Sequence, residues 1–372
     1  MRRFVKWLSY LLSSVAVAAG TAFVFWHHDC LVLSEELLRA GAVPTPRITR
    51  ATLLFGGDVM VHKPQLEEAL GPNGYSFDTT FSLLGELFDT VDLAVVNFET
   101  TLRRQPPFTG YPCFRSPEAI AGALKRIGVD AVMLANNHIC DGAAEGISQT
   151  VDAMQQYGIA YTGAFSDSTQ IDSRNPLYLD AGPMTVAILN YTFGTNGLPV
   201  PKGMAVNRID TVRMGEDLAR IDTSRADIVC VMLHWGEEYM RTPSRQQQQI
   251  ASFLRGRGVR LIIGSHPHVI QPIECDPHGA WAVAYSLGNM VSNQQWRFSD
   301  GGMLLHVELT RVGNAPVSIR LQPIPVWVFP HGHIILPEAV ADTLSMPEYL
   351  RMRYQRFKDD FNQMINNQQN SI

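Results

Sequence analysis

Short apolar runs rich in Val, Ile and Leu recur along the chain, separated by segments with helical periodicity. Seven such runs span residues 51–56, 92–97, 129–135, 184–190, 227–233, 259–264 and 282–287. The helical patterns between them span about 79–90, 117–127, 142–157, 211–221 and 243–256. Runs that are apolar on both faces are typical of strands covered on both sides. The alternation therefore predicts an α/β protein in which helices cover a sheet.

The C-terminal third of the chain has a different pattern. Residues 303–309 and 317–328 predict β segments, and residues 346–366 predict a polar helix. Prolines interrupt the β region at positions 316, 323, 325 and 330. Because proline has no N–H to give to a strand ladder, we expect these prolines to break the β segments.

Residues 7–26 form a stretch of 20 residues without a formal charge. As a helix this stretch would rise about 30 Å, the thickness of the hydrocarbon core of a bilayer. Basic residues precede it, so the positive-inside rule predicts a cytoplasmic N-terminus and an extracytoplasmic remainder. A cleaved signal peptide with a small-residue site at 16–18 is the alternative. Apolar residues continue beyond that site, which favours a retained anchor.

The pattern divides the chain into five segments. We expect a cytoplasmic tail at 1–6, a transmembrane anchor at 7–26, a linker at 27–50, one large domain at 51–330 and a C-terminal helical tail at 331–372. Prolines at 44 and 46 discourage regular structure in the linker.

Composition narrows the classes of function. Charged residues make up 17% of the chain and apolar residues 46%, which excludes wholesale disorder. Thirty Lys and Arg against 35 Asp and Glu give a formal net charge of −5, so we expect no nucleic-acid partner. The five cysteines are too few for a disulfide scaffold, and none forms a Cys-x-x-Cys zinc pair.

Side chains that can bind metals follow five of the seven apolar runs. They are Asp58, Asn97, Glu99, Asn136, Asn137, His138, His234, His266 and His268. Because the carboxyl ends of parallel strands share one edge of a sheet, we expect these side chains to meet there. Carboxylate, amide and imidazole groups together suit Mn, Fe or Zn, and they exceed one tetrahedral shell. The sequence therefore predicts two divalent metal ions bridged by a carboxylate, a site for hydrolysis or group transfer.

Six short motifs in this region resemble those of one known family. They are GD at 57–58, NFE at 97–99, ANNHICD at 135–141, HWGEE at 234–238, GSHPH at 264–268 and YSLGN at 285–289. In order and spacing, residues 52–327 resemble the CapA proteins of capsule (poly-γ-glutamate) synthesis, which belong to the calcineurin-like metallophosphoesterase superfamily.

This resemblance implies a fold, a location and partners. The fold would be a four-layer α-β-β-α sandwich preceded by one transmembrane helix. The protein would be a single-pass protein of the cell membrane, held in the lipid bilayer with its catalytic domain outside the cytoplasm. Its partners would be an anionic polymer, poly-γ-glutamate, and other membrane proteins of capsule synthesis.

The resemblance also implies roles for individual residues. The metal ligands it implies are Asp58, Glu99, Asn137, His234, His266 and His268. Glu99 would bridge the metals, and His138 would contact the substrate or leaving group. The first motif departs from the Asp-x-His of the superfamily, because Met60 stands in place of the histidine. His62, two residues further along, is the imidazole that would replace the missing histidine. How firmly the first metal is held depends on whether His62 takes that role.

Several candidates have alternative roles. Arg115 would clamp a substrate carboxylate or phosphate, or form a surface ion pair. Asn136 is a second substrate-binding candidate. The alternative role of Glu99 is that of a carboxylate at the N-terminus of a helix, where the helix dipole stabilises negative charge. The pair His331 and His333 is expected in a solvent-exposed loop rather than at a metal.

Three functions are compatible with these residues. The first is a dimetal hydrolase or transferase that acts on phosphoryl or γ-glutamyl amide groups, with Glu99 and His138 as catalytic residues. The second is a non-catalytic, membrane-tethered component of capsule assembly that binds polyglutamate. The third is an envelope hydrolase unrelated to capsule, acting on peptides of the peptidoglycan type.

Overall fold

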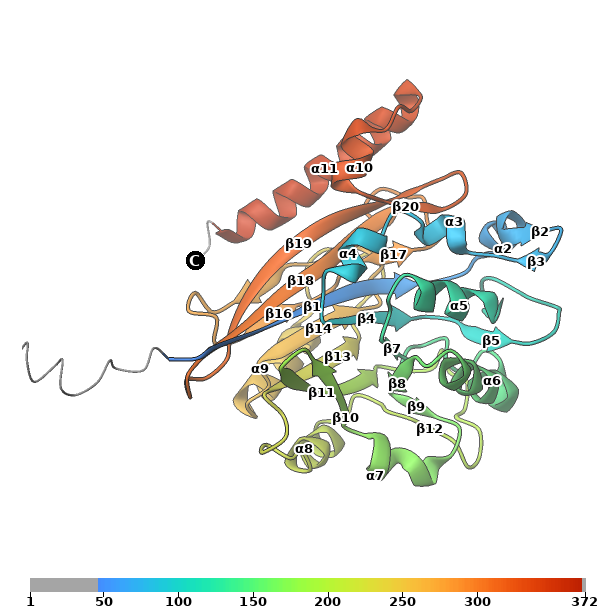
Figure 1. Cartoon of the computed structure of the whole chain (residues 1–372). Coiled ribbons are helices and arrows are strands. Elements are labelled where there is room, and N and C mark those ends of the chain that lie inside the picture. The colour runs from blue at the N-terminus through green and yellow to red at the C-terminus, as the bar shows by residue number, and fades with distance from the viewer. Residues whose placement is uncertain (1–45, 370–372) are drawn as a thin grey trace, which may run out of the picture. The chain divides into compact units, whose positions relative to one another are not determined.

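The computed structural model describes residues 46–369, with side chains described up to residue 366. From Ile48 onward the chain forms one compact unit. This unit is a mixed α/β sandwich of two large sheets with helices around them (Figure 1). The anchor predicted at 7–26 lies outside the described residues. Within residues 46–369, no helix has both the length and the apolar character needed to cross a bilayer.

The first sheet has eight strands, seven of them in the order β20-β19-β18-β1-β4-β7-β8, while β17 also pairs with β1. Their bounds are β1 Ile48–Val59, β4 Leu93–Phe98, β7 Ala131–Met133, β8 Ala160–Thr162, β17 Asn289–Val291, β18 Gly301–Val312, β19 Ser318–Phe329 and β20 Ile334–Pro337. β1 pairs with β4 and β17 in parallel and with β18 in antiparallel fashion. It therefore joins the parallel half of the sheet to the antiparallel half.

The second sheet has six strands in the order β10-β11-β13-β14-β16-β15. Their bounds are β10 Leu177–Ala181, β11 Met184–Thr192, β13 Ile228–His234, β14 Leu261–Ser265, β15 Ile273–Cys275 and β16 Ala282–Ala284. The four central strands are parallel, and the two edge strands run antiparallel to their neighbours. The carboxyl ends of β11, β13 and β14 consequently lie at the same edge.

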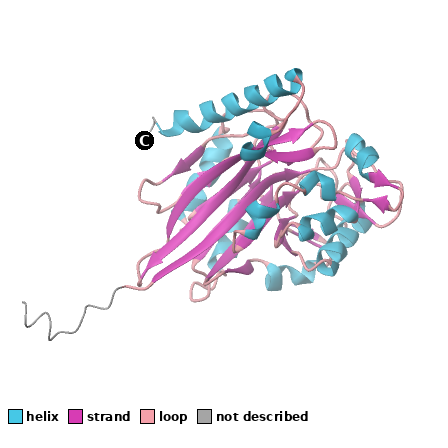
Figure 2. Ribbon diagram, turned by 45° about the horizontal axis from the view of Figure 1, so that its top comes forward, coloured by secondary structure: helices cyan, strands magenta, loops and turns pink. Residues whose placement is uncertain are grey.

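Helices and three short two-stranded ladders complete the fold. The helices are α2 Lys63–Ala69, α3 Asp78–Phe81, α4 Gly85–Asp89, α5 Ala119–Arg126, α6 Ala143–Gln156, α7 Ile171–Arg174, α8 Thr211–Ala219, α9 Arg245–Gly256, α10 Glu338–Thr343 and α11 Glu348–Gln369. The ladders are β2 Leu70–Gly71 with β3 Gly74–Tyr75, β5 Thr101–Arg103 with β6 Arg115–Pro117, and β9 Ala164–Phe165 with β12 Ala205–Val206. Figure 2 shows the longest strands side by side with the helices outside them.

Each of the seven predicted apolar runs overlaps a strand, in chain order β1, β4, β7, β11, β13, β14 and β16. The helix predicted at 79–90 is two short helices, because the turn between α3 and α4 places both Phe81 and Leu84 in the core. The prediction that prolines break the strand at 317–328 is wrong, since β19 runs through Pro323 and Pro325. β20 pairs only with residues 326–329, so the outer edge of β19 beside these prolines needs no N–H from them.

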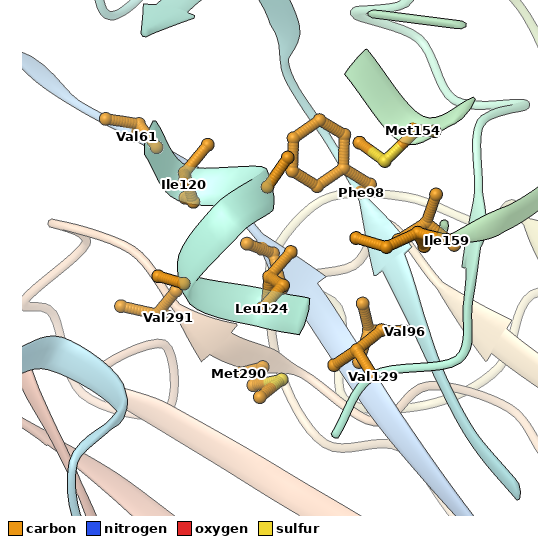
Figure 3. Close-up of a cluster of buried hydrophobic side chains, with 14 of the residues drawn as sticks. Val61, Val96, Phe98, Ile120, Leu124, Val129, Met154, Ile159, Met290 and Val291 are labelled. Carbon is orange, nitrogen blue, oxygen red and sulfur yellow. The ribbon is translucent and has the colours of Figure 1, made fainter. Parts of the chain in front are cut away.

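Alternation along β1 explains how its sheet is covered on both faces. Leu53 and Phe55 belong to an apolar cluster between the two sheets, together with residues such as Ile188 of the second sheet. Leu54 points to the opposite face and belongs to a cluster that includes Leu124 of α5. Figure 3 shows this second cluster, with Val96 near Leu124. Successive strand residues face opposite sides, so one apolar run serves both clusters.

A third apolar cluster lies on the outer face of the second sheet. There Leu189 of β11 and Val231 of β13 join Ile250 and Leu254 of α9. The spacing of four between the two helix residues puts both on one face of α9. Helices therefore cover this sheet from outside, while the cluster that it shares with the first sheet covers its inner face.

The C-terminal helix α11 is part of the same unit. Leu350, Tyr354, Phe357 and Phe361 recur at intervals of four and three residues and belong to the cluster between the sheets. The ring of Tyr354 lies 5.7 Å from that of Trp327 in β19. In Figure 1 the helix lies over the strands of the C-terminal half. Its polar composition belongs to the opposite face, as expected for a helix that covers a sheet.

Candidate metal centre

The six predicted metal ligands are brought together where parallel strands of both sheets end. Each of them is at most 4% exposed, and they are Asp58, Glu99, Asn137, His234, His266 and His268. Asp58 is the penultimate residue of β1, Glu99 follows β4, and His234 ends β13. The two sheets thus deliver side chains to one buried place from positions far apart in the sequence.

Asp58 is aimed by a local irregularity in β1. The register between β1 and β4 shifts at Gly57, so that Gly56 pairs with Val96 and Asp58 with Asn97. Such a bulge turns the next side chain out of the regular pleat. A Cβ atom on Gly57 would lie 2.0 Å from the carbonyl oxygen of Gly288. Glycine is therefore required at position 57 for β1 to approach the loop before β17.

Glu99 lies at the centre of the site. Among the described residues, two groups of side chains have ligand atoms close enough to hold a metal ion, one of Glu99, His266 and His268 and one of Asp58, Glu99 and His234. Glu99 is the member that both groups share. Its Oε1 lies 3.5 Å from Nε2 of His234 and 3.9 Å from Nε2 of His268. The structure thus contains two candidate metal-binding clusters joined by one carboxylate.

Asn137 joins the same place from the loop after β7. Its Oδ1 lies 2.8 Å from Nε2 of His234, the same nitrogen that faces Glu99. Its Nδ2 donates to Oδ1 of Asn196 at 3.2 Å. The amide oxygen of Asn137 therefore points toward the imidazole and carboxylate as its predicted role requires.

The carboxylate of Asp58 is held by three neighbours. Asn97 donates to it from Nδ2 at 2.8 Å, and Nδ1 of His268 lies 3.0 Å from Oδ2. The backbone N–H of His266 donates to both carboxylate oxygens at 3.3 and 3.4 Å. Oδ1 of Asn289 lies 3.1 Å from the same ring nitrogen of His268. These contacts fix the orientation of His268 and leave its Nε2 facing Glu99.

Several buried polar atoms of the site have no hydrogen-bond partner within the part of the chain that the structure describes. They are both carboxylate oxygens of Glu99, Oδ1 of Asn97 and Nδ1 of His266. Leaving buried acceptors unpaired costs free energy, and native proteins rarely do so without a reason. A cation is the partner that a carboxylate, an amide oxygen and an imidazole nitrogen have in common. The donor set therefore fits divalent metal ions.

The charges in the site depend on one another. Burial alone would raise the pKa of Glu99, but His234 and His268 hold it below its ordinary value. Burial alone would lower the pKa of His268, but Glu99 and Asp58 raise it to about 9. Burial and the neighbouring Glu99 raise the pKa of Asp58. Without metal, a proton on His268 compensates part of the buried negative charge.

The segment that carries His266 and His268 has an unusual backbone. Both residues have positive φ, 96° and 57° respectively. Residues other than glycine adopt this region at a cost of roughly 1–3 kcal/mol each, and they do so mainly at functional sites. The conformation turns the N–H of His266 toward Asp58 and the ring of His268 toward Glu99.

His138 is oriented by its own loop. Nδ1 of His138 lies 2.8 Å from Oδ2 of Asp141, which also accepts the backbone N–H of Phe114 at 2.6 Å. The ring of Phe114 meets that of His138 edge to face at 4.6 Å. These contacts engage one ring nitrogen and leave Nε2 for other chemistry.

The two predicted substrate-binding residues have different surroundings. Asn136 is fully buried, donates from Nδ2 to the carbonyl of Phe98 at 2.7 Å, and accepts the N–H of His138. It holds the loop of His138, and its contact with a substrate stays a prediction. Arg115 donates from Nε and Nη2 to the carbonyl of Asp141 at 3.3 and 3.1 Å. No carboxylate of residues 46–369 lies within ion-pair distance of Arg115, so the surface ion pair that was its alternative role is not found there.

Three further histidines lie near the site or were candidates for it. His62 belongs to neither metal-binding cluster of the described residues, and its Nδ1 accepts the N–H of Asn293 at 3.3 Å. Burial lowers the pKa of His62 to about 4. His331 is exposed, as expected. His333 is buried between Glu68 and Asn293, so its expected place in a solvent loop is wrong.

The alternative role of Glu99 is also wrong. No helix begins at this residue, because residues 101–103 form β5. Its carboxylate is thus held in the interior by the fold itself rather than placed to favour a helix dipole.

Sequence reasoning missed two residues that orient histidines of the site, Asn289 and Asp141. Asn289 pairs with Asp58 across β17 and β1 and contacts His268. Asp141 contacts His138. Asn289 ends the motif YSLGN and Asp141 ends the motif ANNHICD, both of which resemble motifs of the family. Their place in these motifs was the available indication that they belong to the site.

Exposed aromatic rings border the site. Phe193 is 44% exposed, and its ring centre lies 4.5 Å from that of His266 and 6.3 Å from that of His234. Tyr239, on the other side, lies 6.1 Å from His268 and 5.5 Å from the exposed Trp296. Burial and the neighbouring Glu238 raise the pKa of Tyr239 to about 12, which keeps its hydroxyl protonated.

The fold and the site define an α/β sandwich with a buried candidate metal centre between two sheets. The chain belongs to the family described as bacterial capsule synthesis protein PGA_cap, whose sequence profile matches residues 52–294. The predicted membership of the CapA family is thereby confirmed.

Relatives of known name support the same assignment. The chain is 27% identical to the capsule biosynthesis protein CapA of Bacillus anthracis over 280 residues, covering 73% of this chain and 66% of that protein. It is 27% identical to the PGA biosynthesis protein CapA of Bacillus subtilis strain 168 over 318 residues, 79% of this chain and 80% of that protein. A probable polyglutamine synthesis accessory protein of Mycobacterium tuberculosis is 25% identical over 64% of this chain and 66% of its own length. The chain thus spans slightly less than two thirds of the Bacillus anthracis protein.

Solved structures with a related arrangement are more distant. A phosphatase from Mycoplasma pneumoniae aligns with a TM-score of 0.45 at 16% identity, covering 75% of this chain and 95% of its own. The NAD nucleotidase of Haemophilus influenzae aligns with a TM-score of 0.46 at 11% identity, covering 82% and 55%. At these values the similarity carries no conclusion about activity.

Proposed function

We propose that this protein is a membrane-anchored, extracytoplasmic component of poly-γ-glutamate capsule synthesis with a dimetal hydrolase or transferase site. The observation that carries the proposal is Glu99, the buried carboxylate that both candidate clusters share. Neither of its oxygens accepts a hydrogen bond from any residue between 46 and 369. A carboxylate in that position suits a bridge between two divalent ions. The reacting group would be a phosphoryl or a γ-glutamyl amide.

The residues that would hold the two ions are the members of the two clusters together with Asn137. Their contacts suggest a division that differs from the clusters. Asp58 lies 3.0 Å from His268, and this pair would hold the first ion with Glu99. His234 lies 2.8 Å from Asn137, with its ring 4.8 Å from that of His266, and these three would hold the second ion with Glu99. Metal ions in such a pair supply Lewis acidity and lower the pKa of bound water. Mn, Fe and Zn all accept this mixture of ligands.

His138 is the candidate for proton transfer to the leaving group. Asp141 engages its Nδ1, so the proton would be held and released at Nε2. His138 is 5% exposed, which keeps solvent away from the transfer.

The names of the relatives support the proposed polymer substrate, and the sequence of residues 7–26 supports the proposed membrane anchor. The named relatives act in capsule, PGA or polyglutamine synthesis, so an anionic γ-glutamyl polymer is the substrate we propose. The uncharged residues 7–26 would anchor the chain in the cell membrane with the metal centre outside, next to other capsule synthesis proteins. We further propose that the fold is the four-layer α-β-β-α sandwich of the calcineurin-like type, supported by its three apolar clusters.

Metal content tests the proposal. The full-length protein, purified in detergent after expression with Mn and Zn, should contain about two divalent ions per chain by elemental analysis. Glu99→Gln should lose at least one of them, because the amide has no charge to share between two cations. Glu67→Gln is the matched control, since Glu67 is exposed on α2, and it should keep both. Background metal content in the unaltered protein would refute the dimetal site.

A non-catalytic role remains the second candidate. It is supported by Met60 in the first motif and by His62, which joins neither cluster. An enzyme requires His138, whereas a tethered polymer-binding component requires only the anchor and the fold. His138→Ala should therefore abolish capsule production if the site is catalytic. Capsule that persists in this variant and disappears when residues 7–26 are deleted would favour the non-catalytic role.

A further inference from the structure

A polar cavity lies beside the loop that carries His138. Its volume is about 140 Å³, several times the ~10–15 Å³ that one water needs. Its lining residues are Leu102, Arg103, Arg115, Gly142, Glu145, Gly146 and Gln149. None of these is in either metal-binding cluster. The cavity is thus separate from the two metal-binding clusters and lies next to the loop of His138.

Local structure explains why two guanidinium groups share this cavity. β5 and β6 pair in parallel, with Thr101 opposite Arg115 and Arg103 two residues further along. Residues two apart on a strand face the same side, so Arg103 and Arg115 lie on one face of the ladder. Gly142 and Gly146 lie against Thr101, where a Cβ on either would come within 3.1 to 3.2 Å of its side chain. The two glycines therefore let the start of α6 pack closely against Thr101, which places the wall of the cavity beside the β5–β6 ladder.

The cavity has more positive than negative charge. Arg115 uses Nε and Nη2 on the carbonyl of Asp141 and keeps Nη1 free of protein acceptors among the described residues. Arg103 is half-buried and forms no ion pair with the described residues. Glu145 is the single acidic lining residue, and its Oε1 accepts Nε2 of Gln149 at 2.9 Å. Two guanidinium groups therefore face one carboxylate that already has a partner.

We propose that this cavity, the Arg103/Arg115 cavity, binds a carboxylate group of the anionic polymer on which the metal centre acts. The inference rests on the proposed function, because it takes the polymer from there. A guanidinium offers parallel N–H donors that match the two oxygens of a carboxylate. A γ-linked glutamate chain carries one free α-carboxylate on every residue, so a group beside the reacting bond is always available.

The connection to the catalytic site runs through Asp141. Its backbone carbonyl accepts from Arg115, and its Oδ2 contacts Nδ1 of His138. A carboxylate bound by Arg115 would thus lie one residue away from the group that orients His138. The cavity would hold the polymer in register while its neighbouring bond enters the metal centre.

Binding of a defined oligomer tests this inference. The probe is a dye-labelled γ-linked glutamate decamer, added to the full-length protein in detergent and followed by fluorescence anisotropy. Arg103→Gln should weaken binding at least tenfold, because one of the two guanidinium groups that line the cavity is lost. Arg104→Gln is the matched control, since Arg104 pairs instead with Glu118 and Asp152, and it should stay within twofold. Arg103 is chosen over Arg115 because it does not contact Asp141.

Two further binding measurements identify which chemical group of the polymer the cavity binds. A decamer with every α-carboxylate amidated should bind at least tenfold more weakly than the acid. Inorganic phosphate should displace the acid decamer only at concentrations far above those of free decamer. Equal binding of the amidated decamer, an unchanged affinity in Arg103→Gln, or displacement by phosphate at lower concentration than by decamer would each overturn the carboxylate assignment.

Metal content of the same samples separates the two proposals. Two ions per chain without Arg103-dependent binding of the decamer would overturn the cavity assignment and leave the dimetal site standing. Arg103-dependent binding in a chain with background metal would support the cavity assignment and refute the dimetal site.

Discussion

Nδ1 of His268 lies 3.0 Å from Oδ2 of Asp58, although 210 positions separate the two residues in the sequence. The contact joins the end of β1 in the first sheet to the loop after β14 in the second. Because Nδ1 is engaged, Nε2 of His268 faces Glu99. The contact brings residues of both sheets into one site. It also leaves Nε2 of His268 as the nitrogen that would bind a metal.

The raised pKa of His268 predicts pH-dependent metal binding. Its value of about 9 means that the imidazole carries a proton at neutral pH in the metal-free protein. A metal ion needs the neutral imidazole, so binding must displace this proton. Metal affinity should therefore rise with pH up to about 9 and fall as pH decreases, by as much as tenfold per unit. Titration calorimetry in buffers of different ionisation enthalpy measures the released proton, and an affinity that is flat from pH 6 to 9 would contradict the assignment.

Asn289 should contribute to metal affinity through His268. Its Oδ1 lies 3.1 Å from Nδ1 of His268, and removal of such an orienting partner typically lowers metal affinity 10- to 100-fold. Asn289→Ala should therefore weaken the tighter of the two binding events by that factor in a competition assay with a fluorescent chelator. The exposed Asn314→Ala is the control and should bind as the unaltered protein does. Equal affinity in both variants would remove Asn289 from the site.

Asp141 should act on turnover rather than on metal content. It contacts Nδ1 of His138 and belongs to neither metal-binding cluster. Asp141→Asn would leave His138 without the carboxylate that fixes the orientation and tautomer of its ring. We expect at least a tenfold lower kcat with two ions still bound. Loss of metal in this variant would show that Asp141 acts by supporting the fold.

Gly57 should contribute to the stability of the fold. A Cβ on this residue would meet the carbonyl oxygen of Gly288 at 2.0 Å, which is backbone and cannot rotate away. Gly57→Ala should therefore cost about 1–3 kcal/mol of unfolding free energy, as overpacking in a core does. Gly85→Ala is the matched control, because nothing lies within 4 Å of its Cβ position. Denaturant unfolding compares the two, and equal midpoints would contradict the close approach of β1 and the loop at 288.

Much of the fold follows from the sequence because strand residues that are buried on both faces must be apolar. That rule located β1, β4, β13 and β14 and, with the shared edge of parallel strands, predicted that Asp58, Glu99 and His234 would meet. The rule fails for very short strands. β17 has only three residues, so nothing in its composition indicated that Asn289 would lie beside Asp58.

Other features depend on tertiary contacts that a local pattern does not contain. Pro323 and Pro325 are tolerated in β19 because β20 covers only the end of that strand. His333 is buried because Glu68, distant in sequence, contacts it. The position of Arg103 beside Arg115 could not be predicted from the sequence either, because it depends on the pairing of β5 with β6.

Anomalous diffraction from crystals of the protein grown with Mn tests the central claim most directly. Two anomalous peaks should appear on either side of Glu99, each about 2.0–2.2 Å from one of its oxygens, with Asp58 and His268 at one and His234, His266 and Asn137 at the other. A single peak, or peaks that leave Glu99 uncoordinated, would contradict the dimetal centre.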